Sequence, residues 1–384
     1  MKEEEQLIML PGPTNVPPRV MRAMLKPIIN HRGPEFKELM ERLTEDAKRV
    51  FGTKGDIVIL SSSGTGGVEC SLSNIVSSGD KVMIPVHGVF SQRVKQIIER
   101  VGGKAVEVPV DWSRAVTIEQ IEDALKKERG AKAIAVVYNE TSTGVKTKCL
   151  KEVGELCNER GLLFVVDAIS ILGGDVLPVD NWHVDICVTG SQKCLMCPPG
   201  LALLSVSEKA WSTIEKNKSQ AHYFNLLPYR EFQKEGQTPY TPAIPLFFAL
   251  DEAFQTIKEE GLEVIFKRHK LCAEALYSAA ENLGLELFAD REFRSNTVIA
   301  VKNPKGILDK DLRELLRKKY RIVIAGGMGK LKGTMFRIGS MGVVSRFEIL
   351  SVVSALESAL ADLGYRSAIG EGVSTAREIF EKSS

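Results

Sequence analysis

The sequence lacks a long apolar run and an excess of either charge. Its apolar stretches are interrupted by Asp, Ser or Gly well before the roughly 18 residues that a membrane span needs. Lys and Arg number 51 and Asp and Glu 49, for a net charge of +2, which gives no reason to expect binding to nucleic acid or to an anionic membrane. The acidic start, Met1 to Glu5, has no basic region followed by an apolar signal core.

A disulfide framework is also missing. The seven cysteines are an odd number and are scattered along 384 residues. We therefore predict a reducing, cytoplasmic compartment. Charged residues at 26% and hydrophobic residues at 44% are close to globular averages, which argues against disorder and coiled coil. At about 150 residues per domain, the length predicts two to three domains.

Short apolar runs alternate with helix-like segments from about residue 50 to 205. Several runs are continuously apolar, as expected for strands buried on both faces. This alternation predicts an α/β fold with a mainly parallel, seven-stranded sheet covered on both faces. The predicted strands are 57–60, 81–84, 105–108, 133–137, 162–166, 186–188 and 202–204, and the helices between them include 66–77, 90–101, 117–128 and 148–160.

The pattern changes after about residue 207. Residues 216–242 are polar and rich in aromatics and Pro, and we interpret them as an excursion or linker. We predict an N-terminal arm (1–20), a large α/β domain (21–255) and a smaller C-terminal α+β domain (256–384). In this later part we expect helices at 246–260, 262–283, 307–319 and 344–363, and strands of a small sheet at 297–301, 322–324 and 335–338.

Four segments carry chemistry. Ser61 to Gly67 follows a strand and opens a helix, a setting that suits a phosphate but also an ordinary N-cap. Asp167 ends a buried strand, where open α/β sheets bind ligands, although it too is a possible N-cap. Lys193 lies in a loop of small residues after a strand and is either a Schiff-base former or a surface lysine. Arg337, among apolar neighbours, is either a carboxylate clamp or a solvated strand residue.

Two common nucleotide-binding motifs are absent from the first of these segments. No Gly-Lys-Ser/Thr closes the loop, so it is not a Walker motif. It also lacks the Gly-x-Gly-x-x-Gly pattern with an acid downstream, which disfavours a nicotinamide-dependent dehydrogenase.

Together, a phosphate cradle, an acid, an amine and a carboxylate clamp are what a pyridoxal phosphate (PLP) enzyme acting on amino acids needs. The chain resembles the fold-type I, class V aminotransferases, particularly the alanine–glyoxylate and serine–pyruvate group. The resemblance runs from Leu10-Pro11-Gly12-Pro13-Thr14 to the last helix. Its most specific segments are 165–170 (VVDAIS), 190–193 (GSQK) with 198–200 (PPG), and 336–339 (FRIG).

The resemblance implies roles for individual residues. Lys193 would form the internal aldimine with PLP and later move the α-proton, and Asp167 would pair with the pyridine nitrogen. Phe90 falls where the alanine–glyoxylate enzymes stack a Trp on the ring, with His87 a second choice. The remaining implied cofactor contacts are Ser63, Gly64, Thr65 and Gln192 to the phosphate, Thr141 near the phenolic oxygen, and Ile169 on the other ring face.

Other implied contacts concern the substrate and a second subunit. Arg337 would bind the substrate α-carboxylate, and Gly12 would line the substrate pocket. Thr238 and Thr241 resemble the segment that reaches the phosphate from the neighbouring subunit, although Tyr240 is an alternative to either. If so, the active unit is a homodimer with active sites at the subunit interface.

The implied function is transfer of an amino group from serine or alanine to pyruvate or glyoxylate. An aspartate or ureidoglycine aminotransferase, a lyase, and a non-catalytic PLP-binding protein remain alternatives. A cysteine desulfurase is disfavoured because the last cysteine, Cys272, lies in a helical pattern rather than a mobile C-terminal segment.

Other motifs are expected to be structural. Cys194 and Cys197 form Cys-x-x-Cys without a second pair at zinc-finger spacing. Residues 326–330 lack the Ser or Thr of a phosphate loop and are expected to form a flexible loop of the small domain. We predict no metal site, because the histidines considered, His31, His183, His222 and His269, are widely dispersed.

Overall fold

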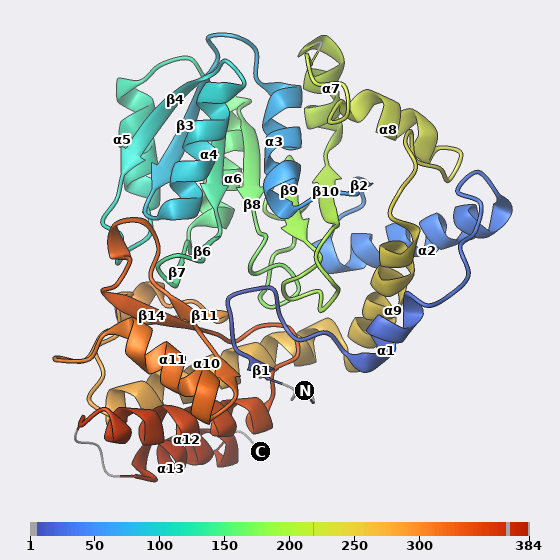
Figure 1. The fold of residues 1–384 in the computed structure, drawn as a ribbon. Coiled ribbons are helices and arrows are strands. Elements are labelled where there is room, and N and C mark those ends of the chain that lie inside the picture. The colour runs from blue at the N-terminus through green and yellow to red at the C-terminus, as the bar shows by residue number, and fades with distance from the viewer. Residues whose placement is uncertain (1–5, 218, 366–368, 383–384) are drawn as a thin grey trace.

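The computed structural model describes residues 6–217, 219–365 and 369–382. It contains a large α/β unit built on one sheet and a smaller unit from the C-terminal part of the chain (Figure 1). The described N-terminal residues lie beside the smaller unit, although the helices that follow them belong to the larger one.

Seven strands form the large sheet, in the order β2-β10-β9-β8-β5-β3-β4. All neighbours are parallel except β10, which is antiparallel to both β2 and β9. The predicted seven-stranded, mainly parallel sheet is therefore confirmed, with each strand within two residues of its expected ends. The strands are β2 (Asp56–Leu60), β3 (Lys81–Val86), β4 (Lys104–Pro109), β5 (Ala131–Val137), β8 (Leu163–Asp167), β9 (Ile186–Gly190) and β10 (Ala202–Val206).

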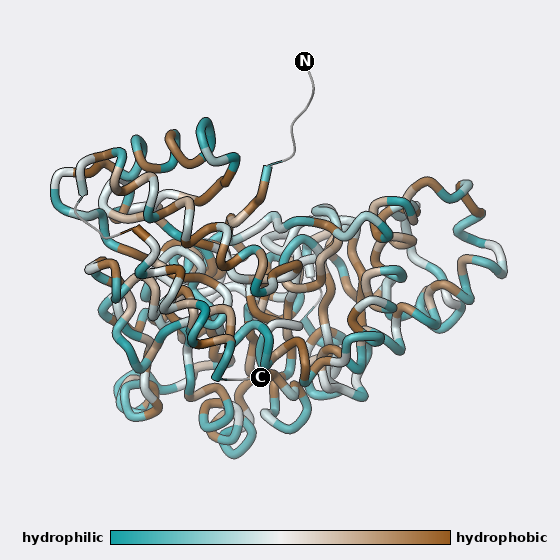
Figure 2. The backbone as a smooth tube through the Cα atoms, turned by 90° about the horizontal axis from the view of Figure 1, so that it is seen from below, coloured by the Kyte–Doolittle hydropathy of each residue, from teal (hydrophilic) through white to brown (hydrophobic). Residues whose placement is uncertain are grey.

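Helices cover both faces of this sheet. Because side chains alternate along a strand, Ile57 and Ile59 join one core cluster and Val58 and Leu60 the other. Figure 2 shows the result as hydrophobic segments in the interior and hydrophilic ones at the rim. The first face packs against α2 (Pro34–Phe51), α5 (Ile118–Lys127), α6 (Leu150–Arg160) and α9 (Ile244–Glu260), and the second against α3 (Gly64–Ile75), α4 (Val89–Arg100), α7 (Glu208–Asn217) and α8 (Leu226–Gln233).

The segment predicted to be an excursion or linker is largely built into this core. Within 216–242, α8 contributes Leu226 and Tyr229 to the cluster on the second face. Phe224 and Tyr240 pack against the same cluster. The linker prediction was wrong. The apolar side chains of this segment are separated by polar residues and turns, so the sequence does not show that they face the same core.

The small unit has its own core between helices and a three-stranded antiparallel sheet, ordered β11-β14-β13. Residues 322–324 were expected in this sheet, but β12 instead pairs in parallel with β1 of the N-terminal segment. The third strand of the small sheet is β13, which consists of residues 325–326. The elements are β11 (Val298–Lys302), β12 (Ile322–Val323), β13 (Ala325–Gly326), β14 (Met335–Gly339), α10 (Leu262–Asn282), α11 (Asp309–Lys319), α12 (Arg346–Asp362) and α13 (Glu371–Glu381).

Short elements complete the described chain. The turn from β6 to β7 follows β5 directly and is important for the site below. These elements are β1 (Leu7–Ile8), α1 (Pro18–Ala23), β6 (Asn139–Glu140), β7 (Val145–Lys146) and the 3₁₀ turns Arg291–Phe293 and Gly329–Leu331.

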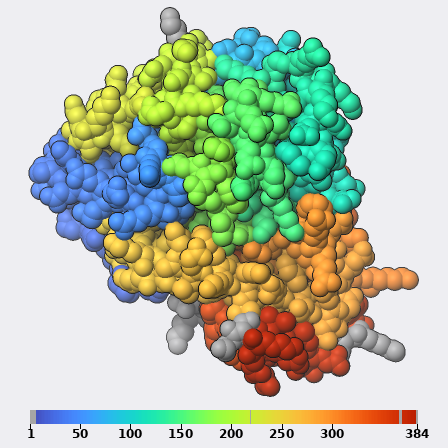
Figure 3. Space-filling view, turned by 180° about the vertical axis from the view of Figure 1, so that it is seen from behind, coloured from blue at the N-terminus to red at the C-terminus, as the bar shows by residue number. Residues whose placement is uncertain are grey.

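The two units meet along α9 and α10. Seen from behind, the gold segment that contains α9 lies between the green large unit and the red C-terminal helices (Figure 3). On α10, Ile265 still belongs to the core of the large unit, whereas Cys272 belongs to that of the small one. The division at residue 255 stays a prediction.

Candidate active site

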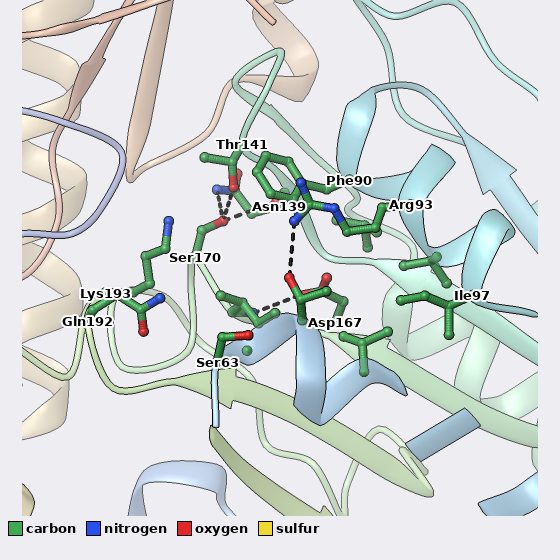
Figure 4. A pocket seen from close by; sticks show the side chains of 16 residues that line it. Ser63, Phe90, Arg93, Ile97, Asn139, Thr141, Asp167, Ser170, Gln192 and Lys193 are labelled. Carbon is green, nitrogen blue, oxygen red and sulfur yellow. Dashed lines mark hydrogen bonds between the residues drawn. The ribbon is translucent and has the colours of Figure 1, made fainter. Parts of the chain in front are cut away.

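A pocket lies where the parallel strands of the large sheet end, as expected for an open α/β sheet. Four loops that follow strands β2, β5, β8 and β9 contribute to it, together with side chains of α3 and α4 (Figure 4). The lining residues are Ser63, Gly64, Thr65, Val68, Phe90, Arg93, Val94, Ile97, Val137, Asn139, Thr141, Asp167, Ile169, Ser170, Gln192 and Lys193. Nine of them are residues that the sequence singled out.

The start of α3 forms one wall. Ser63 caps the helix, and its Oγ accepts a hydrogen bond from Gly66 N at 3.3 Å. A side chain at Gly64 would meet Ile169, since a Cβ there would lie 2.7 Å from Ile169 Cδ1. Glycine therefore brings the backbone of the first turn close to the opposite wall, and a helix N-terminus of this kind favours an anion.

Asp167 is the last residue of β8 and ends inside the pocket. Burial raises the pKa of its carboxyl to about 6, and the hydrogen bond from Ile169 N, at 3.0 Å, opposes this rise. Lys193 and Arg93 also favour the charged form. Asp167 is thus a carboxylate at neutral pH with positive groups nearby.

Lys193 follows β9 and is 9% exposed. Its Nζ donates a hydrogen bond to Pro11 O, so the N-terminal segment lies directly over the amine. Burial lowers the pKa of Lys193 from 10.5 to about 8. With this pKa about a tenth of the amine is neutral at pH 7, far more than in a lysine of ordinary pKa, and a nucleophile or base requires the neutral form.

Gly12 lies against this lysine. Its φ is +99°, a conformation that favours glycine. A Cβ there would lie 2.4 Å from Lys193 Cδ and 2.5 Å from Nζ. The absence of a side chain at position 12 therefore leaves the room that the lysine occupies.

Arg337, in the middle of β14, is 5% exposed and reaches the large unit from the small one. Its Nε and Nη2 donate to Gly326 O at 2.9 and 2.7 Å, and its Nη1 donates to Thr141 O at 2.8 Å. These three bonds fix the plane of the guanidinium and use three of its five N–H groups. The two remaining N–H groups can serve a carboxylate.

Sequence reasoning missed a group of hydroxyl and amide residues behind Thr141. Thr141 Oγ1 and Asn139 Nδ2 both donate to Ser170 Oγ at 2.8 Å (Figure 4). Thr297 Oγ1 donates to Ser170 O at 2.9 Å. Thr297 comes from the small unit, so this network joins the two units beneath the pocket. Ser170 was quoted only as part of a motif, and Thr297 gave no signal because it is distant in sequence.

Arg93 was also missed. Its guanidinium lies 4.8 Å from the centre of the Phe90 ring, and its Nη1 donates to Thr65 Oγ1 at 3.1 Å. The spacing of three residues from Phe90 on one helix was the signal that could have found it. His87, the second choice for a stacking residue, is fully buried and outside the lining, whereas Phe90 is part of it.

The remaining candidates lie outside the lining of this pocket. Thr238 is buried and donates to Tyr240 O at 2.8 Å, and Thr241 is exposed. Their predicted reach into a neighbouring subunit stays a prediction. Burial raises the pKa of Cys194 to about 12 and also raises that of Cys197, so neither is an activated thiol.

The described residues contain neither a metal-ligand cluster nor a membrane-spanning helix. No cluster of His, Cys, Asp or Glu among them is arranged to hold a metal ion. None of the helices in the described part of the chain has the length and apolar character needed to cross a membrane.

Comparison with known proteins gives a consistent result along the chain. A family model described as aminotransferase class-V matches residues 9–347. An uncharacterised aminotransferase of Methanocaldococcus jannaschii is 43% identical over 380 residues, 98% of each chain. A serine–glyoxylate aminotransferase of Methylorubrum extorquens is 36% identical, over 96% of this chain and 94% of that one.

The fold agrees as well. The crystal structure of ureidoglycine–glyoxylate aminotransferase from Bacillus subtilis superposes with a TM-score of 0.94 at 31% identity and covers 99% of both chains. The fold predicted by resemblance, a large parallel-sheet domain with a smaller C-terminal domain, is confirmed.

Proposed function

The chain belongs to the class V aminotransferases, whose cofactor is PLP, and on this basis we propose that it moves the amino group of serine or alanine to pyruvate or glyoxylate. The observation that carries the proposal is one pocket with a buried amine at Lys193 and a half-buried carboxylate at Asp167. Three hydrogen bonds from its guanidinium hold Arg337 close to the same pocket.

The residues of the pocket fit the cofactor. Asp167, a half-buried carboxylate in the pocket lining, suits the nitrogen of the pyridine ring, and Phe90 and Ile169 are apolar side chains for the two faces of that ring. Thr141 offers a hydroxyl for the phenolic oxygen. The phosphate would be held at the start of α3 by Ser63, Gly64 and Thr65, with Gln192 beside the lysine.

When bound, PLP supplies an aldehyde that condenses with amines and a ring that accepts electrons released at the α-carbon. Lys193, neutral in part near pH 8, holds and moves the proton of the α-carbon. Asp167 keeps a proton on the ring nitrogen through its negative charge. Arg337 binds and orients the α-carboxylate through two parallel N–H groups, and Gly12 leaves space beside Lys193.

We further propose a homodimer in which Thr238 and Thr241 reach the partner's phosphate site. The support is that both lie outside the pocket of their own chain, next to the aromatic group of His222, Tyr223 and Tyr240. A cytoplasmic location is proposed on the seven cysteines, all of which are free thiols.

Ureidoglycine and aspartate are the second candidates for the amino donor. Ureidoglycine is favoured by the name of the B. subtilis enzyme, whose structure covers nearly the whole chain. L-aspartate–glyoxylate aminotransferase of Paracoccus denitrificans, 33% identical, favours aspartate.

The test is the absorbance spectrum of the PLP-loaded protein before and after addition of L-serine, L-alanine, L-aspartate or ureidoglycine. We expect a cofactor band that serine or alanine converts to that of pyridoxamine phosphate, and a Lys193→Ala variant that lacks the lysine-dependent band. Conversion by aspartate or ureidoglycine alone would overturn the donor. If wild type and Lys193→Ala give the same spectrum, the assignment of the site is overturned. If wild type has a cofactor band that no donor changes, the result favours a non-catalytic PLP-binding protein.

A further inference from the structure

The first turn of α4 is capped by a different part of the chain. The first four backbone N–H groups of a helix have no partner within the helix. Here Val89 N donates to Ser142 Oγ at 2.9 Å, Phe90 N to Glu140 Oε1 at 3.1 Å, and Ser91 N to Glu140 Oε2 at 2.8 Å. The acceptors are Glu140, the last residue of β6, and Ser142 in the turn that follows, so this hairpin determines where the helix begins.

Glu140 is the central acceptor of this arrangement. It is fully buried, and its carboxylate also accepts from Ser142 Oγ at 2.6 Å and Ser91 Oγ at 2.9 Å. A carboxylate is suited to this position because it accepts several bonds at once and because negative charge is favourable at a helix N-terminus. At Gly88, the residue before the helix, a Cβ would lie 2.2 Å from Glu140 Cδ, so the chain packs closely around the carboxylate.

The same turn contacts the pocket on its other side. Thr141, the next residue, directs Oγ1 to Ser170 in the pocket wall, and its carbonyl accepts from Arg337 Nη1. Phe90, whose N–H the carboxylate binds, lines the pocket from α4. Glu140 itself is not part of the lining. Glu140 is therefore close to Phe90, to Thr141 and to the carbonyl that binds Arg337, but it does not itself line the pocket.

We propose that Glu140 is a positioning residue that sets Phe90, and with it the aromatic face of the pocket, against the cofactor. This inference rests on the proposed function, because it assumes that Phe90 contacts the PLP ring. Glu140 acts through the start of α4: its two oxygens fix two successive N–H groups, and a change in either acceptor moves the turn that bears Phe90. Ser142 supports it by capping the first N–H and by donating to the same carboxylate.

The test compares Glu140→Gln, Phe90→Leu and the double variant with wild type. Glutamine keeps the shape but replaces one acceptor oxygen by an NH₂ group, which faces N–H donors. The measurements are the dissociation constant of PLP from the cofactor-free protein and the circular dichroism of the bound cofactor. A matched control is Glu159→Gln, at an exposed glutamate on α6.

We expect Phe90→Leu to weaken PLP binding roughly three- to tenfold, the range of an aromatic stacking contact. Glu140→Gln should weaken it by a similar factor and reduce the dichroism of the bound cofactor. Because Glu140 acts through Phe90, the effects of the two substitutions should not multiply. The PLP dissociation constant of the double variant should lie within about twofold of that of the single variant that binds PLP more weakly. The control should match wild type.

A second variant covers the case in which Glu140→Gln does not fold. Ser142→Ala removes the cap of Val89 N and one bond to the carboxylate, and it should reduce PLP affinity and dichroism in the same direction. The inference is overturned if these variants lower only the melting temperature and leave the PLP dissociation constant and dichroism at wild-type values. It is also overturned if the effects of Glu140→Gln and Phe90→Leu multiply in the double variant.

The two levels of proposal fail in different arms of the experiment. A wild-type protein that binds no PLP, or a Phe90→Leu variant that binds it normally, refutes the site assigned under the proposed function, and the inference with it. Normal PLP binding by Glu140→Gln beside weakened binding by Phe90→Leu refutes the inference alone.

Discussion

Replacement of Lys193 by methionine should make the cofactor-free protein more stable at neutral pH, although it removes the amine that the proposed reaction needs. The reason is the cost of burying an ammonium group. Lys193 is 9% exposed, and burial lowers its pKa from 10.5 to about 8. At about 1.4 kcal/mol per pH unit, this corresponds to about 3 kcal/mol of destabilisation by the charged form.

Methionine has a similar length and no charge, so it removes this cost. It also removes the hydrogen bond to Pro11 O, which is worth about 1 kcal/mol. The net expectation at pH 7 is therefore an increase of about 2 kcal/mol in the free energy of unfolding.

The pH dependence gives the sharper test. Between pH 8 and 10.5 the unfolded wild-type chain binds a proton at Lys193 that the folded chain has lost. Wild-type stability from this group is thus lowest below pH 8 and rises with pH, by at most about 1.4 kcal/mol per unit, until about 10.5. The Lys193→Met variant lacks this rise, so its advantage shrinks as the pH increases from 7 to 10.

The assay is urea unfolding of both cofactor-free proteins at several pH values between 7 and 10. Lys148→Met, at an exposed lysine, serves as the control and should run parallel to wild type at all pH values. The reasoning is refuted if the free energies of unfolding of wild type and Lys193→Met differ by the same amount at pH 7 and pH 10. Such a result would mean that the pKa of Lys193 is not lowered in the folded state.

Three further expectations follow from the geometry of the pocket. Burial raises the pKa of Asp167 to about 6 in the cofactor-free protein, so the affinity of that protein for PLP should fall as the pH drops through about 6. Asp167→Asn should abolish this acid limb in a profile of PLP affinity against pH and lower kcat at least about 100-fold. Arg93→Met removes a cation that favours the charged form of Asp167, so the same profile should show the acid limb moved to higher pH; an unchanged limb would argue against this influence. Arg337→Lys cannot keep two bonds to Gly326 O and still offer a planar pair of N–H groups, so steady-state kinetics should show KM for the amino donor raised roughly 10- to 100-fold, with PLP affinity unchanged in a titration.

Only part of the pocket lining could be predicted from the sequence. Nine of its lining residues were named from the sequence because the family motifs lie in the loops directly after strands. Arg93, Asn139 and Ser170 were not assigned a role, and their hydrogen bonds in the pocket join segments that are distant in the chain. Such contacts depend on where the strands are placed side by side, which a single sequence does not state.

The sequence by itself determined the order and type of the main elements. Continuous apolar runs and the 3.6-residue period of the helices are local properties, so the seven strands of the large sheet and the helices between them were predictable. The chemical character of Lys193, Asp167 and Arg337 was equally local, because it depends on residue type and on position after or within a strand.

Only the tertiary structure decided which distant groups share one site and in what state. The pairing of β12 with β1, instead of with the small sheet, places Pro11 and Gly12 over Lys193. The cap of α4 by Glu140 and the bonds of Arg337 to Thr141 likewise join segments that are far apart in the chain. Desolvation, which lowers the pKa of Lys193 and raises that of Asp167, arises from this packing, since it depends on every atom that displaces water and not on the neighbours in sequence.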